Sequence, residues 1–277
     1  MRFLIFGDLH GKIPKIKIKD FDAVITPGDF CTDNLKKYMF KAMKLHMQGK
    51  SNKLWYELIG KREAKKLVKK SLQQGRKVLE FLNSLGKPVY IVPGNWDWTK
   101  EPSDWKFLEE DFFKQITKGL RNIKNVHNRL LETDEFSFIG YGIRSGPELP
   151  FDGIMMLEDY QRIQKKYDKL LAKYTKLFKK AKKPVIFISH NVPFATKLDL
   201  ITNKQSPRYG DHVGSVLVRE ICETLNPVIS IAGHMHEHFG KVELNKSIAI
   251  NAGYGPNKNV VLEIKKNKIK KLRFLKK

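Results

Sequence analysis

Five short apolar runs, each followed directly by a polar cluster, constrain the fold of this 277-residue chain more than any other feature. Short, continuously apolar runs are typical of strands that are buried on both faces, as in a sheet covered by helices. We expect such strands at residues 2–6, 22–26, 89–92, 185–189 and 228–232. Longer segments between them repeat apolar residues at three- and four-residue spacing and predict helices over 35–85, 104–113, 152–182 and 215–225. Strands that alternate with helices indicate an α/β layered fold.

The rest of the chain adds a few local signals. Residues 136–141 read as another strand, and alternating runs from Lys241 onward predict antiparallel strands. Ser215 stands directly before a helical pattern and is a candidate N-cap. The sequence contains neither a repeat nor a low-complexity linker, so we expect one domain over residues 1–277. Within it we expect lysine-rich helical insertions at about 31–88 and 151–183, and basic C-terminal strands at 258–277.

The formal net charge of +24 is concentrated in those three segments. They carry net charges of +11, +6 and +8 in chain order, which leaves the remaining residues at −1. Basic segments of this kind favour a polyanionic partner, either a nucleic acid or an anionic membrane surface. The alternative is that they are solvated, lysine-rich helix faces, because 43 of the 53 cations are Lys and Arg is the preferred phosphate ligand.

Composition also excludes several classes of protein. A hydrophobic fraction of 41% is typical of a folded chain rather than a disordered one. No apolar run approaches the roughly 20 residues that a membrane span needs, and the N-terminal run is too short for a signal peptide. Two cysteines cannot form a disulfide framework, so we expect a reducing, cytoplasmic setting.

The polar clusters contain residues that bind metals. They are Asp8-Leu-His10, Gly28-Asp29, Gly94-Asn95, Ser189-His190 and Gly233-His234-Met-His236. Loops after the carboxyl ends of sheet strands commonly form the site in α/β proteins, so these side chains are expected to meet. Two Asp, one Asn and four His give an oxygen and nitrogen ligand set that suits Mn, Fe, Zn, Co or Ni. Seven side chains suit two ions that share one carboxylate, an arrangement that clamps a phosphoryl group.

Each cluster alone has a simpler explanation as a turn. The ordered set of five, after five apolar runs, resembles the calcineurin-like metallophosphoesterase superfamily over residues 7–236. That resemblance implies a four-layer αββα sandwich of two mixed β-sheets flanked by helices. It also implies that a metal-bridging hydroxide attacks phosphorus in line, without a covalent intermediate. By motif position, the implied ligands are Asp8, His10 and His236 for the first metal, Asn95, His190 and His234 for the second, and Asp29 as the bridge.

A second set of motifs resembles small prokaryotic, often archaeal, phosphoesterases. They are Asp211-His-Val-Gly-Ser215, Gly-His-Met-His-Glu237 and Asn251-Ala-Gly253. The chain departs from the superfamily at one position, where the usual Gly-Asn-His-Asp/Glu motif reads Gly94-Asn95-Trp96-Asp97. The missing histidine normally assists the leaving group or binds the phosphate.

His212 is our candidate to replace that histidine, because it precedes a helix whose N-terminal N–H groups could also meet phosphate. The alternatives are that His212 is an ordinary loop residue and that the metals suffice. Asn95 and Asp97 are the other candidate catalytic residues, with Asp97 expected to orient Asn95 or a ligand histidine.

Other residues near these motifs have structural explanations. Trp96, Trp98 and Trp105 could stack on a base or an aromatic leaving group, but packing in a core or a lid is the commoner role. Among the histidines outside the motifs, we expect a structural role for His127 and a solvated face for His46. His238 stays open, with an ordinary surface position as its alternative. Cys31 is expected to be a small buried residue.

The leading hypothesis is a dinuclear metal-dependent phosphohydrolase, with Mn preferred among Mn, Fe, Zn, Ni and Co. Phosphomonoesters and phosphodiesters both fit, and the basic segments favour nucleotide or nucleic-acid substrates. Two alternatives are a non-catalytic or weakly active metal-binding scaffold that binds nucleic acid or protein through its basic helices, and a nuclease that holds DNA or RNA with them. The sequence does not fix the oligomeric state.

Overall fold

The computed structural model describes residues 1–149, 157–206 and 208–276, and it contains two mixed sheets of six strands each. In spatial order the first sheet is β12 (Lys268–Leu275), β11 (Asn259–Lys265), β1 (Arg2–Ile5), β2 (Ala23–Thr26), β3 (Val89–Ile91) and β4 (Ile123–Asn125). The second is β5 (Leu130–Glu132), β6 (Ser137–Tyr141), β7 (Val185–Ser189), β8 (Ile229–Ala232), β10 (Ser247–Asn251) and β9 (Gly240–Leu244). Strands β1 to β4 are mutually parallel, and so are β6, β7, β8 and β10. The remaining strands pair antiparallel at the edges.

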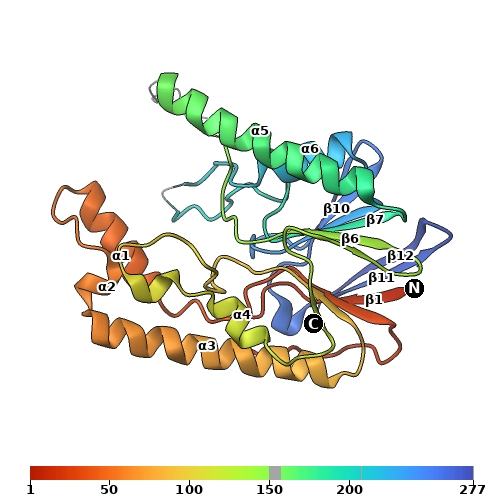
Figure 1. Cartoon of the computed structure of the whole chain (residues 1–277), viewed down its shortest axis with the longest axis horizontal. Coiled ribbons are helices and arrows are strands. Elements are labelled where there is room, and N and C mark those ends of the chain that lie inside the picture. The colour runs from red at the N-terminus through yellow and green to blue at the C-terminus, as the bar shows by residue number, and fades with distance from the viewer. Residues whose placement is uncertain (150–156, 207, 277) are drawn as a thin grey trace.

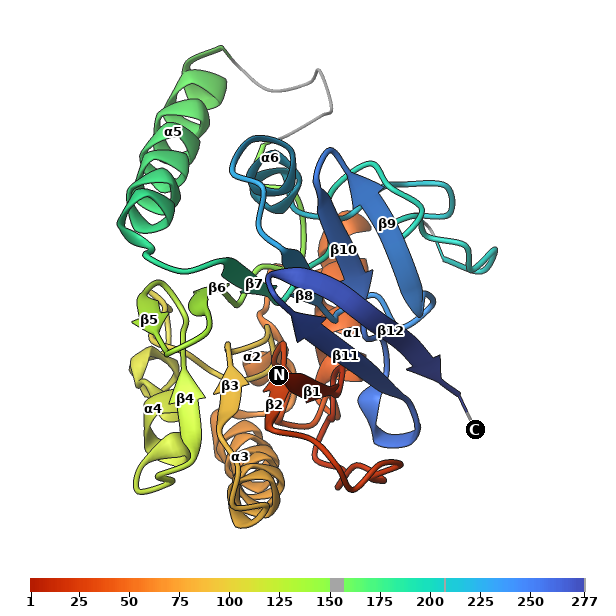
Figure 2. The ribbon, with the colours of Figure 1, turned by 90° about the vertical axis from the view of Figure 1, so that its right-hand side faces the viewer.

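Helices cover the outer face of each sheet (Figures 1 and 2). On the side of the first sheet lie α1 (Lys36–Met47), α2 (Trp55–Leu58), α3 (Lys61–Ser84) and α4 (Phe112–Thr117). On the side of the second sheet lie α5 (Leu157–Lys180) and α6 (Val216–Thr224). Short 3₁₀ turns occupy Lys106–Glu109 and Gly255–Asn257. The four-layer αββα sandwich expected from the sequence is confirmed.

Burial on both faces explains why the strands are apolar throughout. Along β1, Leu4 points toward the layer that contains α3, whereas Phe3 and Ile5 enter the core between the sheets. In the second sheet, Ile186 enters the same central core and Phe187 points toward α5 and α6. Alternate residues of a strand face opposite ways, so a strand between two layers must be apolar at every position.

Several element boundaries differ from the sequence-based prediction. The helical pattern over 35–85 is divided into α1, α2 and α3, with Gly49 and Gly60 at positive φ between them. The helix expected at 104–113 is a 3₁₀ turn followed by α4, because the Asp111 side chain caps α4 by accepting a hydrogen bond from the Lys114 N–H at 2.9 Å. Ser215 caps α6 as predicted, with its Oγ 3.1 Å from the Val218 nitrogen.

The end of the chain also differs in one respect. Strand β10 pairs antiparallel with β9, as expected, but parallel with β8.

Strands β4 and β5 were not predicted, since three residues are too few for a periodic signal. The first residues of the helix expected at 152–182 lie outside the described residues, and the described part is α5.

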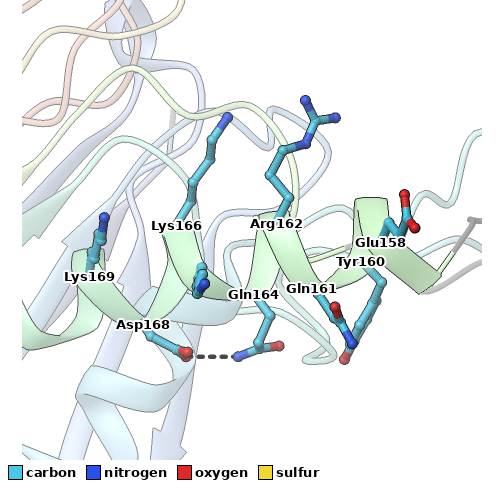
Figure 3. Close-up of a pocket in the computed structure, with 9 residues that line it drawn as sticks. Glu158, Tyr160, Gln161, Arg162, Gln164, Lys166, Asp168 and Lys169 are labelled. Atoms are coloured by element: carbon cyan, nitrogen blue, oxygen red, sulfur yellow. Dashed lines mark hydrogen bonds between the residues drawn. The ribbon is translucent and has the colours of Figure 1, made fainter.

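The lysine-rich segments supply outer layers of the sandwich. Helix α3 buries Val68, Leu72 and Leu79 against the first sheet, and α5 buries Tyr167 and Tyr174 against the second. In Figure 1, α1 and the first part of α5 extend past the sheets on the side where β1 ends. A hollow of about 690 Å³ on α5 is lined, among the described residues, by residues of that helix alone, such as Arg162 and Lys166 (Figure 3). Among the described residues, no helix is long and apolar enough to cross a membrane.

Candidate metal centre

The polar clusters of the sequence meet where the two sheets present their strand ends to each other. Strands β1, β2 and β3 are neighbours in the first sheet, and β7 and β8 are neighbours in the second. Each is followed within a few residues by its cluster. Because β1, β2 and β3 are parallel to one another, and β7 is parallel to β8, their carboxyl ends share one edge, and all seven predicted ligand positions lie at this edge.

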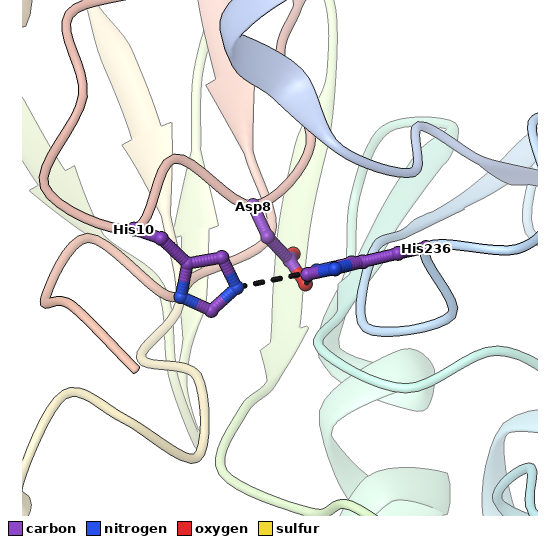
Figure 4. A group of neighbouring side chains, drawn as sticks. All are labelled: Asp8, His10 and His236. Carbon is purple, nitrogen blue, oxygen red and sulfur yellow. Dashed lines mark hydrogen bonds and ion pairs between the residues drawn. The ribbon is translucent and has the colours of Figure 1, made fainter. Parts of the chain in front are cut away.

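Asp8, His10 and His236 form the first group (Figure 4). Each offers one ligand atom, and these atoms lie within 4.8 Å of one another. The Nε2 atoms of His10 and His236 are 3.2 Å apart, and His236 Nε2 is 3.0 Å from Asp8 Oδ2. Asp8 is fully buried, whereas the His236 side chain is 37% exposed. The group therefore has a closed side and a side that a ligand can reach.

Asp29, His190 and His234 form the second group, again with ligand atoms within 4.8 Å. Asn95 joins it, with its Oδ1 2.8 Å from His190 Nε2. Asp29 Oδ2 lies 3.6 Å from His190 Nε2 and 3.7 Å from His10 Nε2. One carboxylate oxygen thus stands between the two groups, which is the position that a shared ligand requires.

The polar atoms of both groups fit divalent cations. His190 Nδ1 lies 2.9 Å from the Pro27 carbonyl oxygen and must donate to it, so the neutral ring carries its lone pair on Nε2. That lone pair faces Asn95 Oδ1, which is also an acceptor, and a cation beside the two atoms would satisfy both. Asp8 Oδ1 is buried and has no hydrogen-bond partner among the described residues. A buried carboxylate oxygen without a donor is costly, and metal coordination removes that cost.

The pKa values of the site residues also favour metal binding. Burial, with the nearby charges of Asp8 and Asp97, raises the pKa of Asp29 well above its usual range. Burial lowers the pKa of His10, and burial together with His190 lowers the pKa of His234 to about 3. Histidines that stay neutral are in the form that binds metals. A divalent cation would offset the mutual repulsion of the three carboxylates.

The backbone around the ligands is strained. His10, Asp29 and His234 have φ values of 44°, 55° and 64°, in the left-handed region that side chains rarely adopt. The glycines that precede two of the motif residues leave room for the carboxylates. A Cβ on Gly233 would lie 2.1 Å from Asp8 Oδ1, and one on Gly94 would lie 2.1 Å from Asp29 Oδ1. Strain of this kind is typical of functional sites, where it holds ligands in one geometry.

Asp97 has a different partner from the one predicted. Its Oδ2 accepts hydrogen bonds from the N–H groups of Asp29 and Gly94, at 2.8 and 2.7 Å. Its Oδ1 accepts from Phe30 and Cys31, at 2.8 and 3.0 Å. Both oxygens are thus used by the main chain, and Asp97 binds neither Asn95 nor a histidine by hydrogen bond among the described residues. It fixes the loop that presents Asp29, and Cys31 is fully buried beneath it, as expected.

His212 is a member of neither group. Its Nδ1 is 2.7 Å from Oδ1 of the buried Asp199, and its ring packs edge-on against Phe194. The structure therefore brings seven of the predicted site residues together and leaves His212 with other partners. Its role in catalysis stays a prediction.

The three tryptophans pack against the layer of α2 to α4. Trp96, Trp98 and Trp105 all border the core between the first sheet and its helices, and the Trp98 ring lies 6.2 Å from that of Trp55. These contacts favour packing over stacking on a substrate. The remaining histidines also have ordinary partners. His46 is exposed beside Asn52, and His238 donates to a backbone carbonyl at 2.6 Å.

Three residues support the site in roles that were not predicted. Asn251 donates to the Met235 carbonyl at 2.7 Å and so holds the turn between His234 and His236. The Tyr254 ring lies 5.4 Å from that of His236. Glu148 is buried and accepts from the Ser215 hydroxyl at 2.7 Å. The Asn-Ala-Gly motif at 251–253 was a signal for the first, whereas the other two have none.

A family model and several solved structures match this chain over most of its length. The family model for calcineurin-like phosphoesterases matches residues 1–238. One crystal structure covers 98% of this chain and 98% of its own at 18% identity, with a TM-score of 0.60, so it shares the fold. The protein TT1561 of Thermus thermophilus is 14% identical over 99% of this chain and 98% of its own, at a TM-score of 0.49. Phosphopantetheinyl hydrolase (PptH) from Mycobacterium tuberculosis is 11% identical over 91% of this chain and 89% of its own, at 0.48.

No curated protein matches the sequence significantly. The family match spans most of the chain and includes every strand end that contributes to the two groups. The chain therefore belongs to the calcineurin-like phosphoesterase family.

Proposed function

We propose that this protein hydrolyses phosphoesters with two divalent cations, one held by Asp8, His10 and His236 and the other by Asn95, His190 and His234. Asp29 is the ligand that both share. The observation that carries the proposal is the Asp29 carboxylate oxygen, which lies within 3.7 Å of a histidine nitrogen from each group. When bound, such a cation pair activates a water molecule and stabilises the charge that develops on the phosphoryl oxygens.

The residues of the chain prepare the site for that chemistry. Asp97 holds the Asp29 loop through the main chain, and the Trp96 N–H donates to Asp29 Oδ1 at 2.8 Å, which leaves Oδ2 directed at the two groups. The Pro27 carbonyl fixes the tautomer of His190. Because Trp96 replaces the usual histidine, another group must stabilise the leaving group; His212 stays our candidate, with the metals alone as the alternative.

The test begins with metal-free protein, to which Mn, Fe, Zn, Ni or Co is added in turn. Nitrophenyl phosphate, bis(nitrophenyl) phosphate and simple nucleotides report monoesterase and diesterase activity. We expect Mn to give the highest rate, and Asp8→Asn and His190→Ala to abolish it. His46→Ala is the matched control, since His46 is exposed and its hydrogen-bond partner is Asn52 rather than a metal ligand. Activity that survives in Asp8→Asn would contradict the proposed site.

Metal binding without hydrolysis of any of these substrates would favour the alternative of a scaffold. Titrations that follow metal uptake separate the two outcomes, because they report ligand occupancy without turnover. All seven ligand positions that the resemblance implies are present, which favours the enzyme over a scaffold that has lost metal ligands.

We further propose that the chain acts as a single cytoplasmic domain, and two free buried cysteines support a reducing setting. Binding of nucleic acid through the lysine-rich segments would weaken steeply with salt, with log K falling linearly against log salt concentration. Binding that is undetectable or independent of salt would assign these lysines to solvation alone.

A further inference from the structure

A second recess begins at the metal centre and runs toward α5. It has a volume of about 690 Å³ and is bordered by Asn95, the 142–147 loop, His127 and two residues of α5, Leu170 and Lys173. That volume lies within the roughly 300–1,000 Å³ of small-molecule sites. The Ser145 carbonyl oxygen lies 3.2 Å from His234 Nε2, so the same loop touches the second metal group and forms a wall of the recess.

Two cations face this recess. Arg144 comes from the loop and Lys173 from α5, and Glu101 is the one carboxylate among the residues that line it within the described chain. His127 adds no charge, since burial and the nearby Lys173 and Arg129 lower its pKa to about 4. The recess is therefore net positive at neutral pH and suits an anion.

The wall of the recess is fixed rather than loose. Glu148 accepts hydrogen bonds from the Tyr141 hydroxyl at 3.0 Å and from the Val216 N–H at 2.8 Å, which ties the loop to the start of α6. Ile143 has a φ of 81° and donates to the Pro93 carbonyl at 2.8 Å. A β-branched residue is a genuine outlier in this region, and such strain persists only where the surroundings impose it. The loop is thereby held against the segment that carries Asn95.

We propose that this recess binds a second phosphoryl group of the substrate, next to the phosphoryl group that reacts at the metal centre. Arg144 and Lys173 would bind this second group. The inference rests on the proposed function. It identifies the preferred substrates as compounds with two adjacent phosphoryl groups, such as nucleoside diphosphates. There the oxygen of water would bond to the terminal phosphorus, the P–O–P anhydride bond would break, and the nucleoside monophosphate would leave with the bridging oxygen. It also gives one lysine of α5 a role in specificity, which its place on a solvated helix face does not suggest.

The test compares substrates with one and two phosphoryl groups. In the metal-loaded protein, Lys173→Met and Arg144→Met should each raise KM for a nucleoside diphosphate by about tenfold or more, because each removes a charge-assisted hydrogen bond. KM for nitrophenyl phosphate should change by less than about twofold, because that substrate does not reach the cations. Lys176→Met is the matched control, an exposed lysine on the same helix.

A binding assay separates the recess from the chemistry. Calorimetry of methylenediphosphonate and of methylphosphonate, neither of which is hydrolysed, reports affinity without turnover. We expect Lys173→Met to weaken only the diphosphonate. Equal weakening of both ligands, or unchanged affinity for the diphosphonate, would overturn the proposal. A protein that binds the diphosphonate as expected but hydrolyses no ester would contradict the proposed function and leave the recess intact.

Discussion

The Asp97 carboxylate is the feature whose removal has the most calculable effect. It is fully buried and accepts four backbone N–H groups, those of Asp29, Phe30, Cys31 and Gly94. Asparagine has the same shape but offers one acceptor oxygen. In Asp97→Asn, two of the four hydrogen bonds are lost, and the new NH₂ group faces two N–H donors.

The magnitude follows from those four bonds. A hydrogen bond to a charged group contributes about 1.5–3 kcal/mol, so two of them are worth about 3–6 kcal/mol of unfolding free energy. Whole proteins are stable by only about 5–15 kcal/mol, so the loss is large. Relaxation of the loop would reduce this loss of unfolding free energy, and the conflict between the new NH₂ group and the N–H donors would increase it. The same change frees the main chain of Asp29, so the affinity for both cations should fall too.

Denaturant unfolding of the metal-free protein measures the effect. We expect the midpoint for Asp97→Asn to fall while the slope of free energy against denaturant stays constant. Asp134→Asn is the control, because Asp134 is an exposed carboxylate in a turn. A loss below about 0.5 kcal/mol, within the usual range of surface substitutions, would refute the claim that Asp97 holds the site together.

Three further predictions follow from the geometry. Gly233→Ala places a Cβ 2.1 Å from Asp8 Oδ1, so the carboxylate must move by about an ångström. We expect the variant to fold and its hydrolysis rate to fall by about 10²-fold. Gly240→Ala is the control and should keep wild-type kinetics, because its added Cβ meets nothing within 4 Å. His127 has a pKa of about 4, so between pH 6.5 and 4 it stays unprotonated in the folded protein while the unfolded chain takes up a proton. The free energy of unfolding should therefore fall by up to about 1.4 kcal/mol per pH unit as pH drops through this range. His127→Gln should flatten that slope, and an unchanged slope would contradict the role of His127. If His212 is the acid that replaces the missing histidine, His212→Ala should slow the hydrolysis of esters with poor leaving groups by about 10²-fold or more and leave nitrophenyl esters nearly unaffected. An unchanged rate on an ester with a poor leaving group would remove His212 from the mechanism.

The sequence predicts the strands well because each is buried on both faces. Continuous apolar runs such as 185–189 have no other simple explanation, and their polar ends then identify the ligands. Strand β4 lacks this signal, since it contains only three residues and none of them is fully buried. The helix expected at 104–113 was divided by Asp111, whose cap was hidden among other charges.

Contacts between distant side chains and the main chain were harder to predict. Asp97 lies in a familiar motif, but three of its four partners are N–H groups 66 to 68 residues earlier in the chain. His212 precedes a helix, which suggested an anion site, yet a buried carboxylate at Asp199 binds its ring instead. Periodicity and motif order carry no information on these contacts, because the packing of loops decides which side chains and N–H groups meet.

Each metal group draws its ligands from both sheets. Asp8 and His10 follow a strand of the first sheet, and His236, more than 220 residues later, follows a strand of the second. Asp29 and Asn95 are joined in the same way to His190 and His234. A bound cation would thus act as a cross-link between the two halves of the sandwich, closing a loop that spans most of the chain. Thermal stability should then rise with the logarithm of free metal concentration, so that metal supply sets how much of the protein is folded as well as how fast it works.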